Sequence, residues 1–247
     1  MTAARGASPS HGPDARDGGV LVVDEVRVVD EDRGTDVLRR LRTETAVEHQ
    51  AVEDTLDLLS PALTRERLAD VLTAMHGFWL TAEASLDAWA QAEPADAAGV
   101  DWPRRRRAAL FAADLAALGA TGPTPRPALS DVPDTDAALG RMYVLEGSSL
   151  GGVFIDRHLA TLPQLTGVGR LSAFSPYGEE TGAMWHAFRT VTRARIADGG
   201  NADRLVAAAR ETFGALAGWC GAPSPGGAPW SPARSTHSST RGNEVVA

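Results

Sequence analysis

Apolar residues recur every three or four positions through the middle of the chain, which is the period of an amphipathic helix. From 38 to 59 this spacing predicts one helix, with Thr35 or Asp36 as its N-cap and Ser60-Pro61 as its stop. The predicted inner face of this helix comprises Leu38, Leu41, Thr45, His49, Val52, Leu56 and Leu59. The same face therefore carries one histidine among apolar residues.

Five more helices are expected along the chain. The second is capped by Thr64, and the others cover 104–118, 134–160, 178–197 and 202–219. The second helix would bury Leu68, Val71, Leu72, Met75, Trp79, Ala82, Leu86 and Trp89. Since no strand-like alternation separates these segments, we expect an all-α fold, a single-domain multi-helix bundle over 36–220. Outside it, the segment 21–29 could be a strand, a partner-binding segment or a partly ordered leader.

Composition separates the two ends from the middle. Residues 1–35 are rich in Gly, Asp, Ser and Pro, and 221–247 in Pro, Gly and Ser, so both are expected to be disordered tails. The net charge of −8 argues against binding to nucleic acid or to anionic membranes. With a single cysteine, Cys220, and no long apolar run, we expect a soluble, cytoplasmic protein.

His49 is the first candidate for chemistry. Glu53 follows it by four residues on the same helix face, where its carboxylate can reach the ring nitrogen Nδ1. A histidine that binds a metal typically donates its other N–H to such a partner. Arg42 lies two turns earlier and could pair with an anionic group of a ligand. The alternative is a core histidine that is satisfied by hydrogen bonds.

A glycine-rich stretch, Glu146-Gly147-Ser148-Ser149-Leu150-Gly151-Gly152, lies inside a predicted helix. Each glycine costs a helix about 1 kcal/mol relative to alanine, so something must approach the main chain closely. Gly147 and Gly151 share one face, against which a flat ligand could lie. The alternatives are a close helix–helix contact and a helix break. The stretch also fits the G-x-S-x-G pattern of serine hydrolases, with Ser149 as nucleophile, but that motif requires a strand before the turn.

Three segments resemble haem oxygenases, in the order and spacing of that family. The spacing of Arg42, Thr45, His49 and Glu53 is similar to the proximal-helix signature, and 139–152 resembles the distal helix. The segment 176–185 resembles a third motif of the bacterial branch that is associated with bacteriophytochromes. Together the similarity spans about 36–220.

The resemblance implies roles for individual residues. His49 would be the axial ligand of the haem iron, Glu53 its hydrogen-bond partner, and Arg42 a neighbour of a haem propionate. Gly147 and Gly151 would lie over the haem, with Gly152 beside them. Ser148 stands where animal members have an aspartate that organises pocket water. Arg189 or Arg193 could also reach a propionate, and Tyr177 and Trp185 could be either core or pocket wall.

The implied activity is oxidative cleavage of haem to biliverdin, with release of CO and ferrous iron. Haem would be both substrate and cofactor, and O2 the oxidant. Since Gly167-Val168-Gly169 lacks the third glycine of a dinucleotide-binding motif, electrons would come from a ferredoxin or a flavoprotein. The basic run 104–107 could dock such a donor or be a solvated helix face, and a bacteriophytochrome could accept the biliverdin. Three alternatives remain open: a haem carrier or sensor, a related fold for another ligand, and the hydrolase.

Overall fold

The computed structural model describes residues 37–120 and 122–222. Every regular element in these ranges is helical, as expected, and the expectations for 1–35, for 21–29 and for most of 221–247 lie outside them. The elements are α1 (Val37–Glu44), α2 (Ala46–Leu56), α3 (Arg65–Ala92), α4 (Pro94–Gly99), η1 (Trp102–Arg105), α5 (Ala108–Ala117), α6 (Thr135–Leu159), η2 (Pro163–Leu165), η3 (Gly178–Glu180), α7 (Thr181–Ala197) and α8 (Ala202–Gly221).

Side-chain caps begin three of the long helices. Thr64 accepts a hydrogen bond from the N–H of Arg67 at 3.1 Å, which confirms the predicted start of α3. Asp134 and Asn201 cap α6 and α8 in the same way. Each cap satisfies a main-chain donor that has no partner within its helix. The eight apolar positions expected inside α3 are all buried.

The single helix predicted over 38–59 is two helices, which meet at Thr45. The Thr45 hydroxyl donates to the carbonyl of Leu41 at 2.7 Å, and such bonding to the preceding turn bends helices. Main-chain bonds still continue on both sides, from Thr45 to Leu41 and from His49 to Thr45. The helix ends at Leu56, earlier than expected, because Asp57 adopts a left-handed conformation with φ of 46°.

The helix predicted over 104–118 begins late, at Ala108, after the short 3-10 helix η1. Helix α4 precedes it and was not predicted, since six residues are too few to show a helical period.

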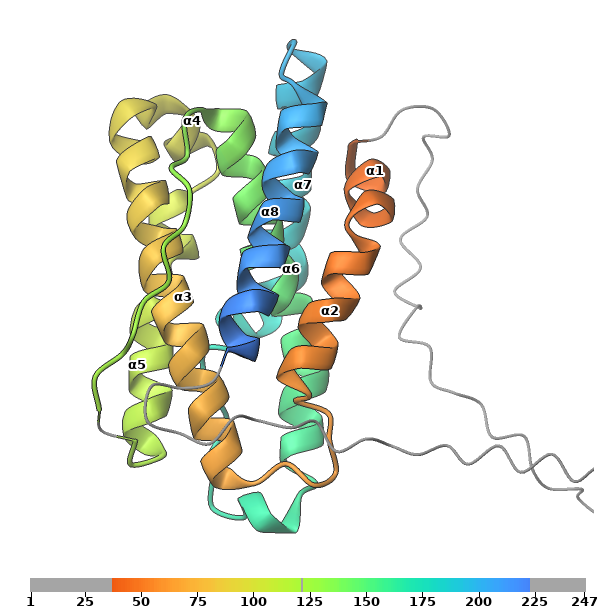
Figure 1. Cartoon of the computed structure of the whole chain (residues 1–247). Helices are drawn as coiled ribbons and strands as arrows, with labels where there is room; N and C mark the ends of the chain where they lie inside the picture. Colours follow the sequence, from red (N-terminus) through yellow and green to blue (C-terminus); the bar gives the residue numbers. More distant parts are fainter. Residues whose placement is uncertain (1–36, 121, 223–247) are drawn as a thin grey trace, which may run out of the picture. The chain divides into compact units, whose positions relative to one another are not determined.

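Helix α8 lies at the centre of the bundle, where it contacts α1, α2, α3 and α6 (Figure 1). Gly140 permits the close approach of α6, because a Cβ there would overlap the carbonyl oxygen of Leu205. Helices α2 and α6 run in the same direction on neighbouring sides of α8 (Figure 1). No helix between residues 37 and 222, Thr121 aside, is both long and apolar enough to cross a bilayer.

Candidate functional site

Thr45, which precedes α2, forms a side-chain hydrogen bond with Tyr143 of α6. His49 of α2 and Tyr143 also both pack against the Phe213 ring of α8. His49 follows Thr45 by four residues, and Gly147 follows Tyr143 by four. Since both helices run in the same direction, one further turn of about 5.4 Å along each brings the chain to His49 and Gly147. The candidate histidine and the first candidate glycine therefore lie at corresponding turns of two helices that both pack on α8.

The His49 ring is accessible. Its side chain is 55 % exposed, and its Nδ1 lies 3.8 Å from Oε1 of Glu53, which is too long for a hydrogen bond but close enough for an electrostatic pair. One edge of the ring packs against Phe213 of α8, with ring centres 5.4 Å apart, and Phe213 in turn contacts Tyr143. His49 is thus held by an aromatic contact rather than enclosed as a core histidine, and a ring nitrogen remains accessible for a ligand.

The two glycines on the expected face of α6 have open space beside them. A Cβ on Gly147 or on Gly151 would meet nothing within 4 Å, so neither glycine is explained by a contact with another helix. Leu150 and Phe154, one turn further along, are 37 % and 45 % exposed and are among the few large apolar side chains left open. This face of α6 offers bare main chain flanked by apolar side chains, as an apolar flat ligand requires.

Ser148 and Gly152 lie on a different side of α6 from Gly147 and Gly151. One residue on from Gly147 and Gly151, they are rotated by about 100° around the helix. A Cβ on Gly152 would overlap the carbonyl oxygen of Phe174. Ser148 accepts a hydrogen bond from Arg107 at 2.6 Å. Close packing therefore explains Gly152, whereas it does not explain Gly147 or Gly151.

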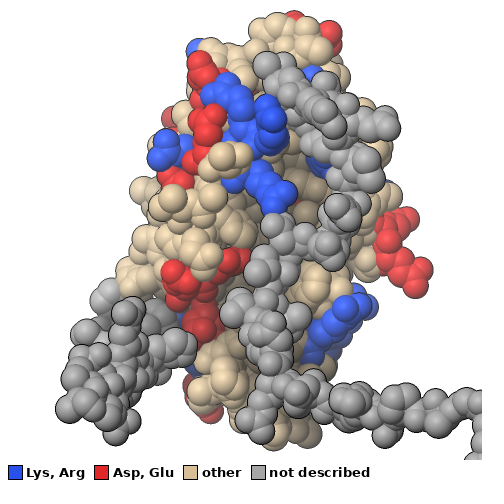
Figure 2. Space-filling view, turned by 90° about the vertical axis from the view of Figure 1, so that its right-hand side faces the viewer, with Lys and Arg blue, Asp and Glu red and all other residues tan. Residues whose placement is uncertain are grey.

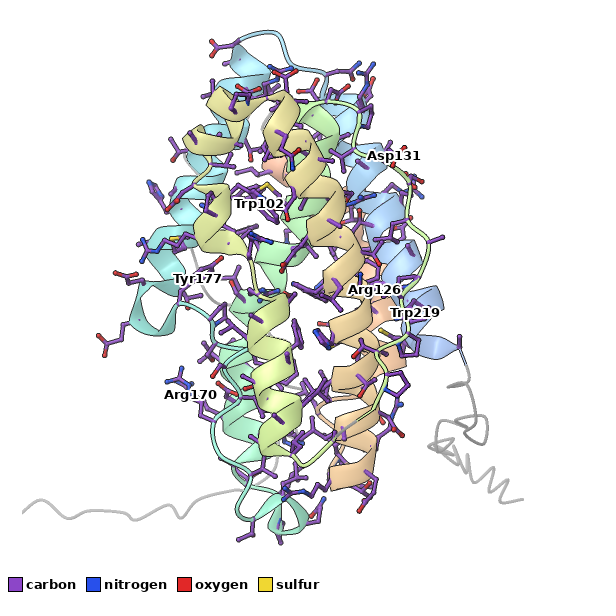
Figure 3. All side chains as sticks on the ribbon, turned by 90° about the vertical axis from the view of Figure 1, so that its left-hand side faces the viewer. Trp102, Arg126, Asp131, Arg170, Tyr177 and Trp219 are labelled. Atoms are coloured by element: carbon purple, nitrogen blue, oxygen red, sulfur yellow. The ribbon has the colours of Figure 1, made fainter. Side chains whose placement is uncertain are left out.

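A buried polar cluster supports α6 from behind. Glu146 forms an ion pair with Arg105. It also accepts a hydrogen bond from the Tyr177 hydroxyl at 2.7 Å. Burial and the Glu146 carboxylate raise the pKa of Tyr177, so this hydroxyl stays protonated and donates. Figure 3 shows Tyr177 in the segment that leads into α7. Tyr177 is therefore a hydrogen-bond partner of Glu146, and its contact with a ligand stays a prediction.

The basic run 104–107 is divided between the interior and the surface. Arg105 and Arg107 are buried, while Arg104 pairs with Glu180 and Arg106 pairs with Asp87 at 2.9 Å. The side chains of Arg104 and Arg106 are 51 % and 53 % exposed, so the run is not a continuous solvated helix face. Docking of an electron donor at these two arginines stays a prediction.

Two further basic residues, Arg42 and Arg189, act on Tyr143 of α6. Burial raises the pKa of Tyr143, whereas a hydrogen bond with Thr45 and the positive charges of Arg42 of α1 and Arg189 of α7 lower it. Figure 2 shows Arg side chains gathered on the upper part of the face that carries α1. Trp185 of α7 packs on Tyr143, with ring centres 5.8 Å apart, and thus lies beside this end of the site. The importance of Tyr143 was missed, although its spacing from Gly147 could have revealed it.

Ser149 cannot serve as the nucleophile of a hydrolase. It lies within α6, is 1 % exposed, and donates to the carbonyl of Glu146 at 2.7 Å. No strand precedes it in the described part of the chain, so the turn that the hydrolase motif requires is missing.

The other described histidines have different surroundings. His76 lies 3.2 Å from the Thr124 hydroxyl, His158 lies 3.2 Å from the Ser60 carbonyl, and His186 is exposed. Within 37–120 and 122–222, no three His, Cys, Asp or Glu side chains gather in a group that could hold a metal. Two surface hollows, one beside Asp87 and one beside His76, do not include His49.

The fold and site define a class of all-helical proteins in which an accessible histidine stands near uncovered glycine main chain. No family model matches the sequence. A haem oxygenase of Xanthomonas campestris pv. campestris is 31 % identical over 117 residues, which cover 47 % of this chain and 67 % of that protein.

A solved structure agrees in fold. It is the NO- and CO-bound haem oxygenase of Neisseria meningitidis, with a TM-score of 0.56, 22 % identity, and coverage of 78 % of this chain and 96 % of that one. The chain belongs to the haem oxygenase family.

Proposed function

We propose that this protein binds haem between α2 and α6, with His49 on the iron, and opens the ring to biliverdin with release of CO and ferrous iron. Oxygen is the oxidant, and a ferredoxin or a flavoprotein supplies the electrons. The observation that carries the proposal is the position of His49 and Gly147, each one turn beyond the Thr45–Tyr143 contact, with open space beside Gly147 and Gly151.

The residues present suit a haem. A porphyrin is flat and apolar with two anionic propionates, and the site offers Leu150 and Phe154 for the ring. Arg42 and Arg189, whose charges both act on Tyr143, would provide positive charge for the propionates at one end. The accessible imidazole of His49 provides a nitrogen ligand of the kind that haem iron accepts in many proteins.

Bound haem supplies both the iron that activates oxygen and the ring that is cleaved. An imidazole ligand from His49 would lack the electron push of a thiolate, and the Glu53 carboxylate, 3.8 Å from Nδ1, would act electrostatically on the orientation of that ring. Gly147 and Gly151 would present main chain, and no polar side chain, to the bound group. Leu150 and Phe154 would cover part of the ring, and the arginines would pair with its propionates and so set which edge faces α6.

Turnover separates an oxygenase from a haem carrier or sensor. Haemin-loaded protein is given oxygen and a ferredoxin–reductase system, and the absorption spectrum and evolved CO are followed. We expect the Soret band to decay as biliverdin absorbance and CO appear. A Soret band that persists without either product would establish a carrier. A biliverdin acceptor such as a bacteriophytochrome stays a prediction.

Replacing Arg42 or Arg189 by glutamine should weaken haemin binding by several-fold each, since an exposed ion pair contributes up to about 1 kcal/mol. The ratio of biliverdin isomers should also change, because the propionates would no longer fix the orientation of the ring. Haemin titration and chromatography of the products measure the two effects. Arg126→Gln, on the exposed segment beside α3 (Figure 3), is the control. Unchanged affinity in both site variants would contradict the assigned orientation.

A further inference from the structure

The most deeply buried cation of the described helices lies behind the glycine stretch. Arg107 is 2 % exposed, and its guanidinium lies over the Trp79 ring, 5.0 Å from the centroid. Its main-chain N–H donates to Glu83 at 2.6 Å, and the N–H of Ala108 donates to the same oxygen at 2.8 Å. The base of the side chain is therefore anchored to α3 at the start of α5.

The guanidinium of Arg107 forms hydrogen bonds with α6. Nη2 donates to the carbonyl of Leu145 at 2.7 Å and to the hydroxyl of Ser148 at 2.6 Å. Ser148 also donates to Leu145 at 2.7 Å, so the three groups form one small network. These bonds flank Gly147, one on each side along the sequence.

A second hydrogen bond of Arg107 acts at the C-terminal end of the glycine-rich stretch 146–152. Nη1 of Arg107 donates to the carbonyl of Ala173 at 3.3 Å, and the next residue, Phe174, packs its carbonyl against Gly152. Asp114 of α5 holds the same loop, since it accepts hydrogen bonds from the N–H groups of Ser172 and Ala173 at 2.9 and 2.8 Å. Arg107 thus acts on α6 both before Gly147 and, through the loop, after Gly151.

Burying a guanidinium is costly, and a well-packed apolar side chain often stabilises a fold equally well. The Nε of Arg107 is buried with no hydrogen-bond partner, so the residue is not optimised for stability alone. From these contacts we infer that Arg107 is a positioning residue, which fixes the main chain of α6 at Gly147–Gly151 and thereby sets how closely that main chain approaches a bound haem. This inference rests on the proposed function for its consequence, but the positioning itself is testable in haem-free protein.

The test compares Arg107→Met with Arg141→Met. Arg141 is an equally buried arginine of α6, but it bonds to Ser85 and to the Ser130 carbonyl, away from the glycines. Hydrogen exchange of haem-free protein is followed by mass spectrometry in peptides covering 145–153. We expect at least about tenfold faster exchange there in Arg107→Met alone, because hydrogen bonds from a charged donor are among the strongest in proteins.

Arg107→Lys serves where the methionine variant fails to fold, since lysine keeps the charge but cannot bond to α6 and Ala173 together. Its exchange in 145–153 should lie between wild type and Arg107→Met. In the CO complex of haem-loaded protein, the C–O stretching band should shift or broaden in the Arg107 variants, and kcat should fall with little change in haemin affinity. Exchange that is unchanged, or that rises equally in both methionine variants, would overturn the inference. Absence of biliverdin from the wild type would instead overturn the proposed function.

Discussion

His49→Ala is expected to bind haemin without the histidine–iron band and to lose biliverdin formation by more than about 100-fold. Loss of an outer hydrogen-bond partner of a metal-bound histidine already costs about 10–100-fold, so loss of the ligand itself should cost more. Glu53→Gln should show that smaller effect, because it only loosens the orientation of the ring. Resonance Raman spectra of the ferrous protein and single-turnover assays measure the two quantities.

Added imidazole should restore part of the His49→Ala activity, because it can enter the space that the missing side chain leaves. The matched control is His186→Ala, which removes an exposed histidine of α7 and should behave as wild type. If His49→Ala retained the wild-type spectrum and turnover, another residue would have to bind the iron.

Gly152→Ala should destabilise the fold by about 1–3 kcal/mol, because its methyl group would overlap the main chain of Phe174 and force α6 and the loop apart. Gly151→Ala should instead stabilise the haem-free protein by up to about 1 kcal/mol. Its methyl group meets open space, and alanine is the better helix former. Two adjacent glycines in one helix are thus expected to respond with opposite signs.

Urea unfolding of haem-free protein, followed by circular dichroism at 222 nm, measures both changes directly. Equal destabilisation by the two substitutions would mean that Gly151 is packed like Gly152. The proposed haem face of α6 would then be wrong.

The helices could be predicted because their apolar spacing and caps are local properties of the chain. Leu68, Leu72, Met75 and Trp79 repeat at the helical period, and Thr64 caps the helix that carries them. The proximity of His49 and Glu53 could be predicted in the same way, because residues four apart lie on one face of a helix. The resemblance to haem oxygenases added the prediction that His49 and Gly147 contact the same ligand. Helix periodicity alone does not predict this.

Other features depend on contacts between distant segments of the chain, and the sequence alone could not predict them. A run of four arginines looks solvated, and only the carboxylates and carbonyls of distant segments show that Arg105 and Arg107 are internal. Likewise, Gly147, Gly151 and Gly152 look alike in the sequence, and only the structure shows that, of the three, Gly152 alone packs against Phe174. The break at Thr45 was hidden because the apolar pattern passes through it unchanged.

The most direct measurement is an anomalous difference map at the iron edge, from crystals of the protein grown with haemin. The account predicts one iron peak within bonding distance of a His49 ring nitrogen, with the porphyrin against the main chain of Gly147 and Gly151. An iron peak beside His76, His158 or His186, or a porphyrin that leaves the glycine face of α6 uncovered, would contradict it.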